Sequence, residues 1–167
     1  LGEYLTPSVV GVDDDGTIIV GSAAKQRLLS HPDKTVANFK RAMGTDKVFQ
    51  LGKNKYHAED LSALVLRQLK QDAQACLGEQ VTEAIISVPA YFSDTQRSKT
   101  KMAGVLAEFK VDRIINEPTA AALAYGLHER DQETRLMVFD LGGGTFDVSI
   151  VEMYDGVIEI LSSTGNN

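Results

Sequence analysis

The stretch Asp140-Leu-Gly-Gly-Gly-Thr-Phe-Asp147 lies between an apolar run at 136–139 and an alternating run at 146–150. This arrangement predicts two strands joined by a tight glycine turn. Adjacent glycines let the backbone adopt conformations closed to other residues, and they bring several N–H groups close to a bound anion. The stretch therefore favours a phosphate-binding hairpin.

The residues around the glycines distinguish this hairpin from other phosphate loops. No Gly-Lys-Ser/Thr opens a helix, and a strand follows the glycines, so neither a Walker A loop nor a dinucleotide fingerprint is present. Asp140 can hold Mg²⁺ directly or through water, and Thr145 offers a hydroxyl at the other end of the turn. A plain tight turn is the alternative for the glycines taken alone, and the flanking Asp140, Thr145 and Asp147 weigh against it.

Upstream of the hairpin, the sequence predicts alternating strands and helices. Apolar runs at 81–88 and 113–115 are typical of strands, the first of them covered on both faces. Between them, Ser93 and Gln96 form a capping-box pattern that opens a helix, whose expected buried stripe is Met102, Val105, Leu106 and Phe109. An amphipathic helix ending at Gly78 precedes these elements, and the result is an α/β layered core.

Glu117 and Lys40 are ambiguous on local sequence. Glu117 follows the strand at 113–115 and opens a proline-initiated, alanine-rich helix, a place where open α/β sheets collect functional groups. The alternative is a carboxylate that only stabilises the helix N-terminus. Lys40, beside Arg41, could equally belong to a solvated helix face.

The first sixty residues predict a small α+β region. β-Branched runs at 6–12 and 17–20 flank Asp13-Asp-Asp-Gly16, which predicts a hairpin. The single cysteine, Cys76, excludes an internal disulfide and is expected to be an inert, buried thiol on a helix face.

Composition narrows the class of protein. The 167 residues are 43 % hydrophobic and 24 % charged, as expected of a globular domain. Lys and Arg number 17 against 23 Asp and Glu, a net charge of −6, which argues against nucleic-acid and membrane binding. The first residue is Leu1, so we expect a piece of a longer protein, and the single cysteine fits the reducing compartment of the cytoplasm.

Three segments together carry a family resemblance. They resemble the ATPase domain of heat-shock protein 70 (DnaK-type) chaperones. The segments are the glycine hairpin at 140–147, Asn116-Glu-Pro-Thr-Ala-Ala-Ala-Leu-Ala-Tyr-Gly126 and Val88-Pro-Ala-Tyr-Phe92. The segments beginning at Glu3, Ser30 and Phe39 are most similar to the bacterial HscC-type branch. The resemblance covers essentially the whole chain.

The resemblance implies a partial actin-like ATPase fold with ribonuclease H-like layers and a small peripheral α+β subdomain. Residues 1–60 would form that subdomain of lobe I, residues 61–134 the α/β core of lobe I, and residues 135–167 the first strands of lobe II. The family's first phosphate hairpin and adenosine-binding segment lie outside this chain. Glu108 stands where relatives often place glycine.

The resemblance also implies roles for individual residues. Lys40 would position the attacking water, while Glu117 and Asp140 would organise Mg²⁺ through its water shell. Gly142, Gly143, Gly144 and Thr145 would hold the β- and γ-phosphates of ATP or ADP, and Asp147 would tune the site. Pro89 and Arg97 would form an allosteric relay; on local sequence alone, a strand terminator and a surface helix residue are the preferred interpretations.

The implied cofactors are ATP or ADP, Mg²⁺ and K⁺. The implied partners are unfolded polypeptides, bound by a domain outside this chain, together with a J-domain co-chaperone and a nucleotide exchange factor. Two rival functions share the superfamily, a sugar or acetate kinase and a nucleotide-switched filament subunit. The motif at 116–126 argues against the kinase.

Overall fold

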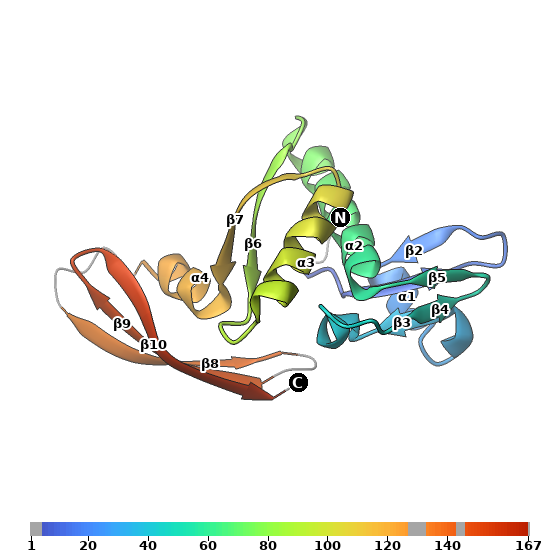
Figure 1. The fold of residues 1–167 in the computed structure, drawn as a ribbon. Helices are drawn as coiled ribbons and strands as arrows, with labels where there is room; N and C mark the ends of the chain where they lie inside the picture. The colour runs from blue at the N-terminus through green and yellow to red at the C-terminus, as the bar shows by residue number, and fades with distance from the viewer. Residues whose placement is uncertain (1–4, 127–132, 143–145, 167) are drawn as a thin grey trace. The chain divides into compact units, whose positions relative to one another are not determined.

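The computed structural model describes residues 5–126, 133–142 and 146–166 (Figure 1). The chain divides into two compact units. Unit 1 comprises residues 1–84 and 98–112, and unit 2 comprises residues 85–97 and 113–167. The three-segment division expected from the sequence stays a prediction.

Unit 1 opens with a small antiparallel sheet of order β2-β1-β3, formed by Val9–Val12, Ile18–Val20 and Thr35–Ala37. The predicted hairpin at 13–16 is confirmed. Its turn is held by the Asp13 and Asp15 carboxylates, which accept hydrogen bonds from the backbone N–H groups of Asp14 and Thr17 at 2.8 Å. Gly16 adopts φ 89°, which favours glycine.

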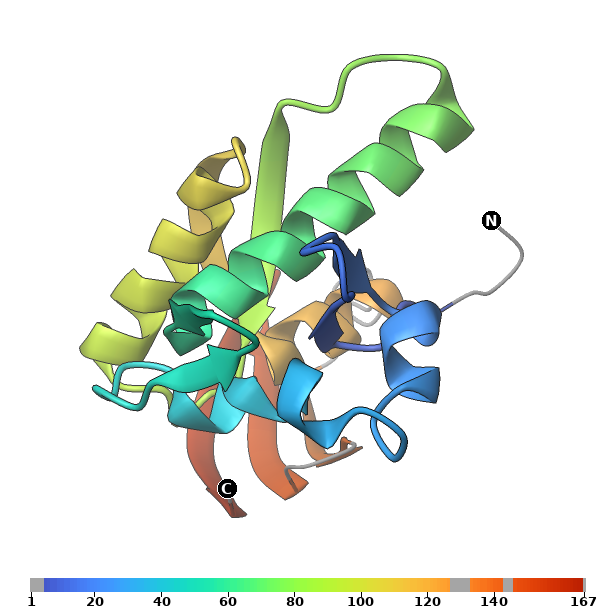
Figure 2. The same cartoon turned by 90° about the vertical axis from the view of Figure 1, so that its right-hand side faces the viewer.

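The core of unit 1 joins this sheet to a long helix. Unit 1 also contains several short elements. They are helix α1 (Ser22–Gln26), the short turns η1 (Pro32–Lys34) and η2 (Phe39–Ala42), and the hairpin of β4 (Phe49–Leu51) and β5 (Asn54–Tyr56). Helix α2 (Ala58–Leu77) lies beside the strands, as Figure 2 shows. The buried cluster that they share comprises Val10, Val12, Phe39, Leu51, Leu61 and Val65.

Helix α2 buries only its first half. Asp60 accepts a hydrogen bond from the His57 N–H at 2.8 Å, and Gly78 ends the helix with φ 72°, as predicted. Leu61 and Val65 are buried, whereas Leu69 is half-exposed and Cys76 is exposed. The prediction of a buried Cys76 thiol is therefore wrong, because the core cluster on this helix ends at Val65. Across the described ranges, no helix combines the length and apolar content of a membrane span.

Strand β6 (Glu83–Val88), helix α3 (Asp94–Leu106) and strand β7 (Lys110–Asn116) each contribute residues to both units. The predicted capping box is confirmed: the Ser93 N–H donates to Gln96 Oε1 at 2.9 Å, and the Gln96 N–H donates to Ser93 Oγ at 3.4 Å. β6 pairs with β7 in a two-stranded sheet, and Ile85 is 65 % exposed, so β6 is not covered on both faces as predicted.

The buried face of α3 also differs from the prediction. Met102, Val105 and Leu106 are exposed, whereas small side chains are buried. Small residues allow the helix backbone to approach its neighbours closely, which a count of large apolar residues does not register. The buried residues around this helix are Thr100, Ala103, Gly104, Ala107 and Phe109.

Basic side chains of α2 cap the C-terminus of α3. Arg67 Nη2 donates to the Leu106 carbonyl and Lys70 Nζ to the Glu108 carbonyl, both at 2.7 Å. Lys70 Nζ also lies 5.1 Å from the centroid of the Phe109 ring. Glu108 itself has φ 65°, a left-handed conformation that costs a residue with a Cβ about 1 kcal/mol or more. These contacts stabilise the chain reversal in spite of that strain.

Replacing Glu108 by glycine should stabilise unit 1. The left-handed strain disappears, while the extra freedom of glycine in the unfolded chain offsets part of the gain, so we expect the free energy of unfolding to rise by about 0.5–1 kcal/mol. Urea denaturation of the 167-residue chain measures it. The control Glu79→Gly removes an exposed glutamate from a loop with ordinary φ and should not stabilise. A Glu108→Gly variant no more stable than wild type would contradict the strain argument.

An ion pair joins α2 to α3 within unit 1. Lys99 Nζ lies 2.6 Å from Glu59 Oε1, and the Glu59 side chain is only 8 % exposed, against 40 % for Lys99. Burial by itself would raise the pKa of Glu59, but hydrogen bonds from Lys99 and the backbone, with the Lys99 charge, lower it below its ordinary value. The hydrogen bond and charge of Glu59 raise the pKa of Lys99.

Lys99→Met should lower the Tm of the chain at neutral pH by about 2–4 °C, because the variant leaves the buried Glu59 carboxylate without its ammonium partner. The pKa of Glu59 is lowered by folding, so its contribution is present above the unfolded pKa and is lost as the pH falls through the folded value. The difference in Tm should therefore close in acid. Thermal unfolding across the acid range measures it, with Lys101→Met as control. A constant difference at every pH would rule out the ion pair as its source.

Unit 2 contains helix α4 (Glu117–Ala124) and an antiparallel sheet of order β10-β9-β8, formed by Val157–Asn166, Phe146–Tyr154 and Thr134–Leu141. The two strands predicted on either side of the glycine turn are confirmed as β8 and β9, and β10 adds a third strand. α4 packs on one face of the sheet, where Ala122, Val151 and Met153 are buried. The other face of β8 exposes Met137, Phe139 and Leu141.

Candidate functional site

Asp140, Asp147 and Gly165 form one row across the sheet of unit 2. Asp140 on β8 is the register partner of Asp147 on β9, and Asp147 is the partner of Gly165 on β10. Directly opposed residues of antiparallel strands point to the same face, so both carboxylates lie on one side of the sheet. Asp147 is 5 % exposed and Asp140 is half-buried.

The opposed carboxylates suit a cation. Like charges directly opposite one another destabilise a strand pair, and a bound cation removes that repulsion. Carboxylate oxygens are the hard donors that Mg²⁺ prefers, and Mg²⁺ usually binds one or two carboxylates while keeping waters and phosphate oxygens as its other ligands. Within the described part of the chain, no group of three or more acidic, His or Cys side chains could hold a metal by itself. The residues therefore fit an ion bound jointly with a phosphate.

The glycine turn itself falls mostly outside the described residues. Gly142 follows β8 and is exposed. Gly143, Gly144 and Thr145 lie outside the described ranges, so their predicted contacts with phosphate stay predictions. The strands on either side pair as far as Leu141 and Phe146, which places both ends of the turn side by side.

Glu117 belongs to the layer that covers the carboxylate face. It is the first residue of α4, after an extended Asn116, with Pro118 in the first turn. α4 packs on Val151 and Met153, and these side chains alternate along β9 with the same parity as Asp147. Glu117, Asp140 and Asp147 are thus on the same side of the sheet, as a shared site requires.

Arg97 contacts the other predicted relay residue, Pro89, and its neighbours. Its Nη2 donates to Asn116 Oδ1 at 2.7 Å, to the Ala90 carbonyl at 3.0 Å and, at 3.5 Å, to the Pro89 carbonyl. Its Nε donates to the Phe92 carbonyl at 3.0 Å. One guanidinium therefore fixes the loop at 89–92 to the residue that precedes Glu117.

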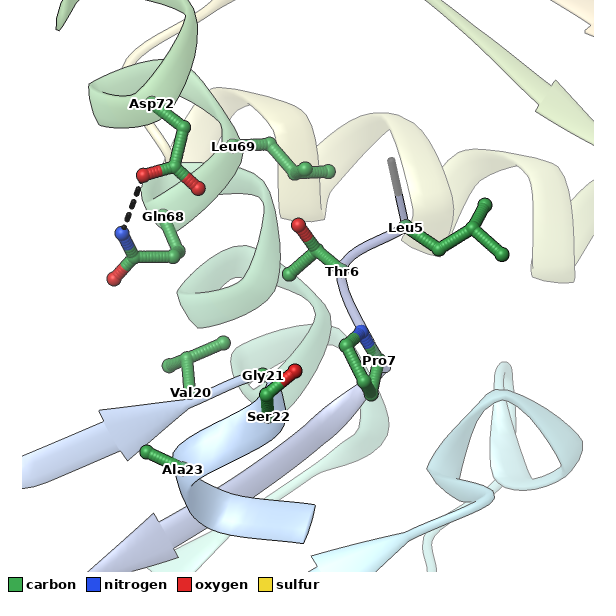
Figure 3. Close-up of a pocket in the computed structure, with 10 residues that line it drawn as sticks. All are labelled: Leu5, Thr6, Pro7, Val20, Gly21, Ser22, Ala23, Gln68, Leu69 and Asp72. Atoms are coloured by element: carbon green, nitrogen blue, oxygen red, sulfur yellow. Dashed lines mark hydrogen bonds between the residues drawn. The ribbon is translucent and has the colours of Figure 1, made fainter. Parts of the chain in front are cut away.

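The other features lie in unit 1. Lys40 is in η2, half-buried, next to the core residue Phe39. A cavity of ≈ 560 Å³ between α2 and the start of β1 contains none of the predicted site residues; Figure 3 shows Gln68 donating to Asp72 along its wall, at 3.0 Å. Leu5, Gly21 and Leu69 also line it.

Two residues of the site were missed by sequence reasoning, Gly165 and Tyr91. The Tyr91 ring and the Asp147 carboxylate both lie next to Gly165 in unit 2. A glycine inside a strand is a sign of close backbone approach, and this signal was available at Gly165. Tyr91 lies in the segment Val88–Phe92 that carries the family resemblance, but local sequence gives its side chain no role.

Comparison with known proteins shows the family of the chain. The model of the family described as "Hsp70 protein" matches residues 1–167. The chain belongs to the Hsp70 family. Two Hsp70 relatives are each named "Chaperone protein DnaK". The one from Thermotoga neapolitana is 50 % identical over 166 residues, and the one from Thermotoga petrophila is 49 % identical over 166 residues. In both cases 99 % of this chain matches, and it spans 28 % of the relative's length.

Proposed function

We propose that this Hsp70 chain is part of a chaperone domain that binds and hydrolyses ATP. The observation that carries the proposal is the opposed pair Asp140 and Asp147, at the ends of strands that enclose three glycines, in a chain matched throughout by the Hsp70 family. Binding and release of unfolded polypeptide would follow the nucleotide state. The architecture would be the actin-like ATPase fold, with residues 1–60, 61–134 and 135–167 as its successive parts.

The residues of the site would divide the work of phosphoryl transfer. Bound Mg²⁺ would supply charge neutralisation at the transferring phosphate. Asp140 and Glu117 would orient the waters of that ion, and Gly142, Gly143, Gly144 and Thr145 would hold the β- and γ-phosphates. Lys40 would position the attacking water. Asp147 would tune the charge next to Asp140. The family also implies K⁺ as a cofactor.

The remaining parts of the proposal concern the complete protein. Pro89 and Arg97 would transmit the nucleotide state to a peptide-binding domain beyond this chain, and a J-domain co-chaperone and a nucleotide exchange factor would regulate the cycle. The Arg97 hydrogen bonds to the Pro89 loop and to Asn116 support this role, because they tie the loop to the start of α4. The protein would work in the cytoplasm, in the HscC-type branch.

Single-turnover ATP hydrolysis by the complete protein tests the proposal. Glu117→Ala and Thr145→Ala should each lower the rate at least about tenfold, while nucleotide affinity falls less, since both groups would act mainly in the transition state. Glu159→Ala and Thr164→Ala are matched controls, because both residues are exposed on β10 of the same unit. Unchanged hydrolysis in both test variants would refute the assigned roles, and a wild-type protein that does not hydrolyse ATP would refute the function.

A further inference from the structure

Gly165 is a close-approach glycine in the carboxylate row. A methyl carbon built on it would lie 2.1 Å from Asp147 Oδ1, and 2.6 Å and 3.0 Å from Cε1 and Cδ1 of the Tyr91 ring. Carbon atoms essentially never approach other heavy atoms to these distances. The Asp147 carboxylate and the edge of the Tyr91 ring therefore both occupy the space that a side chain at Gly165 would fill.

Neither neighbour can give way cheaply. Asp147 has a short side chain and is 5 % exposed, so it has little free volume into which to turn. Tyr91 belongs to the loop at 89–92, and Arg97 holds the Ala90 and Phe92 carbonyls on either side of it at 3.0 Å. The ring of Phe92 also packs edge-to-face with that of Tyr91, at 6.0 Å between centroids.

We propose that Tyr91 and Gly165 are positioning residues that hold the Asp147 carboxylate opposite Asp140. This inference rests on the proposed function, since it concerns the rate of the same reaction. Gly165 leaves the space beside its Cα free for the carboxylate, and the edge of the Tyr91 ring borders the same space. Displacement of the carboxylate by about 1 Å is enough to lower a rate as much as a hundredfold.

The inference also connects the loop at 89–92 to the phosphate hairpin. Arg97 fixes the loop, the loop carries Tyr91, and Tyr91 lies against the glycine opposite Asp147. The ring, rather than the hydroxyl, makes the close approach. Tyr91→Phe should therefore preserve the site, and Tyr91→Ala should loosen it.

Single-turnover hydrolysis by the complete protein is the first test. Gly165→Ala and Tyr91→Ala should each lower the rate about ten- to hundredfold, with KM for ATP changing less than about threefold. Tyr91→Phe should stay within about twofold of wild type, as should the control Thr164→Ala, whose side chain is on the opposite face of the same strand. If Gly165→Ala does not fold, the rates of Tyr91→Phe and Tyr91→Ala decide whether the Tyr91 ring positions Asp147.

The same substitutions in an Asp147→Ala background separate positioning from general damage. If Tyr91 and Gly165 act through Asp147, neither substitution lowers the remaining rate by more than about twofold there. An equal loss in both backgrounds would overturn the proposal. So would wild-type rates for Tyr91→Ala.

Crystal structures of wild type, Tyr91→Ala and Gly165→Ala give a readout that does not depend on activity. We expect the Asp147 carboxylate to shift by about 1 Å in the variants, and an unmoved carboxylate would overturn the proposal. If the wild-type protein hydrolyses no ATP, the proposed function fails, and these structures still decide whether Tyr91 and Gly165 position Asp147.

Discussion

Asp140→Asn is expected to lower single-turnover ATP hydrolysis by the complete protein about 10²–10³-fold, the usual effect of losing one group that stabilises transition-state charge. Asn keeps the shape of the side chain and removes the negative charge that would orient the waters of Mg²⁺. Asp140 also faces Asp147 directly across the strand pair. The substitution therefore removes one of two like charges.

The same variant should be slightly more stable without nucleotide or Mg²⁺. Relief of the repulsion between opposed carboxylates is worth about 0.2–1 kcal/mol, which urea denaturation of the chain in EDTA can measure. Loss of rate with gain in stability is the signature of a charge retained for function. The control is Glu133→Gln, an exposed carboxylate directly before β8 with an ordinary φ, which should change neither. If Asp140→Asn has both a normal hydrolysis rate and unchanged stability, then Asp140 does not help to bind the ion and the two carboxylates do not repel each other measurably.

Arg97→Ala is expected to lower the free energy of unfolding by about 2–3 kcal/mol. The guanidinium donates to three backbone carbonyls and to the Asn116 side chain, and its removal leaves these part-buried acceptors without their donor. Arg97→Lys should recover only part of the loss, because an ammonium cannot reproduce the planar fork. Urea denaturation gives the stability, and hydrogen exchange of residues 89–92 shows whether the loop opens.

The control for Arg97 is Arg113→Ala, an exposed arginine on β7 in the same unit. It should cost less than about 0.5 kcal/mol. Equal losses for the two variants would mean that the Arg97 hydrogen bonds contribute no more than a general surface charge. Full recovery with lysine would mean that charge, and not the fork, holds the loop.

Local signals in the sequence predicted the elements that local chemistry determines. The structure contains the Asp-Gly hairpin at 13–16, the capping box of Ser93 and Gln96, the glycine cap at Gly78 and the strand pair around the glycine turn. Each depends on residues close together in the chain, so the pattern and its cause are both visible in the sequence.

What the sequence did not predict depends on distant neighbours. The large apolar residues of α3 indicated a buried stripe, but close packing of Thr100, Ala103 and Gly104 selects another face. Cys76 has the spacing of a buried residue but lies beyond the core cluster. Gly165 and Tyr91 meet only because β10 pairs with β9 while the loop at 89–92 reaches Gly165, a contact that local sequence does not contain.

The exposed thiol in the last turns of α2 gives experimenters a ready attachment point. Cys76 is the chain's sole cysteine, so a maleimide dye would label one position of unit 1 without any mutagenesis. A second cysteine introduced at exposed Tyr154 would place the partner fluorophore in unit 2. Energy transfer between the two dyes would then measure the separation of the two units in solution.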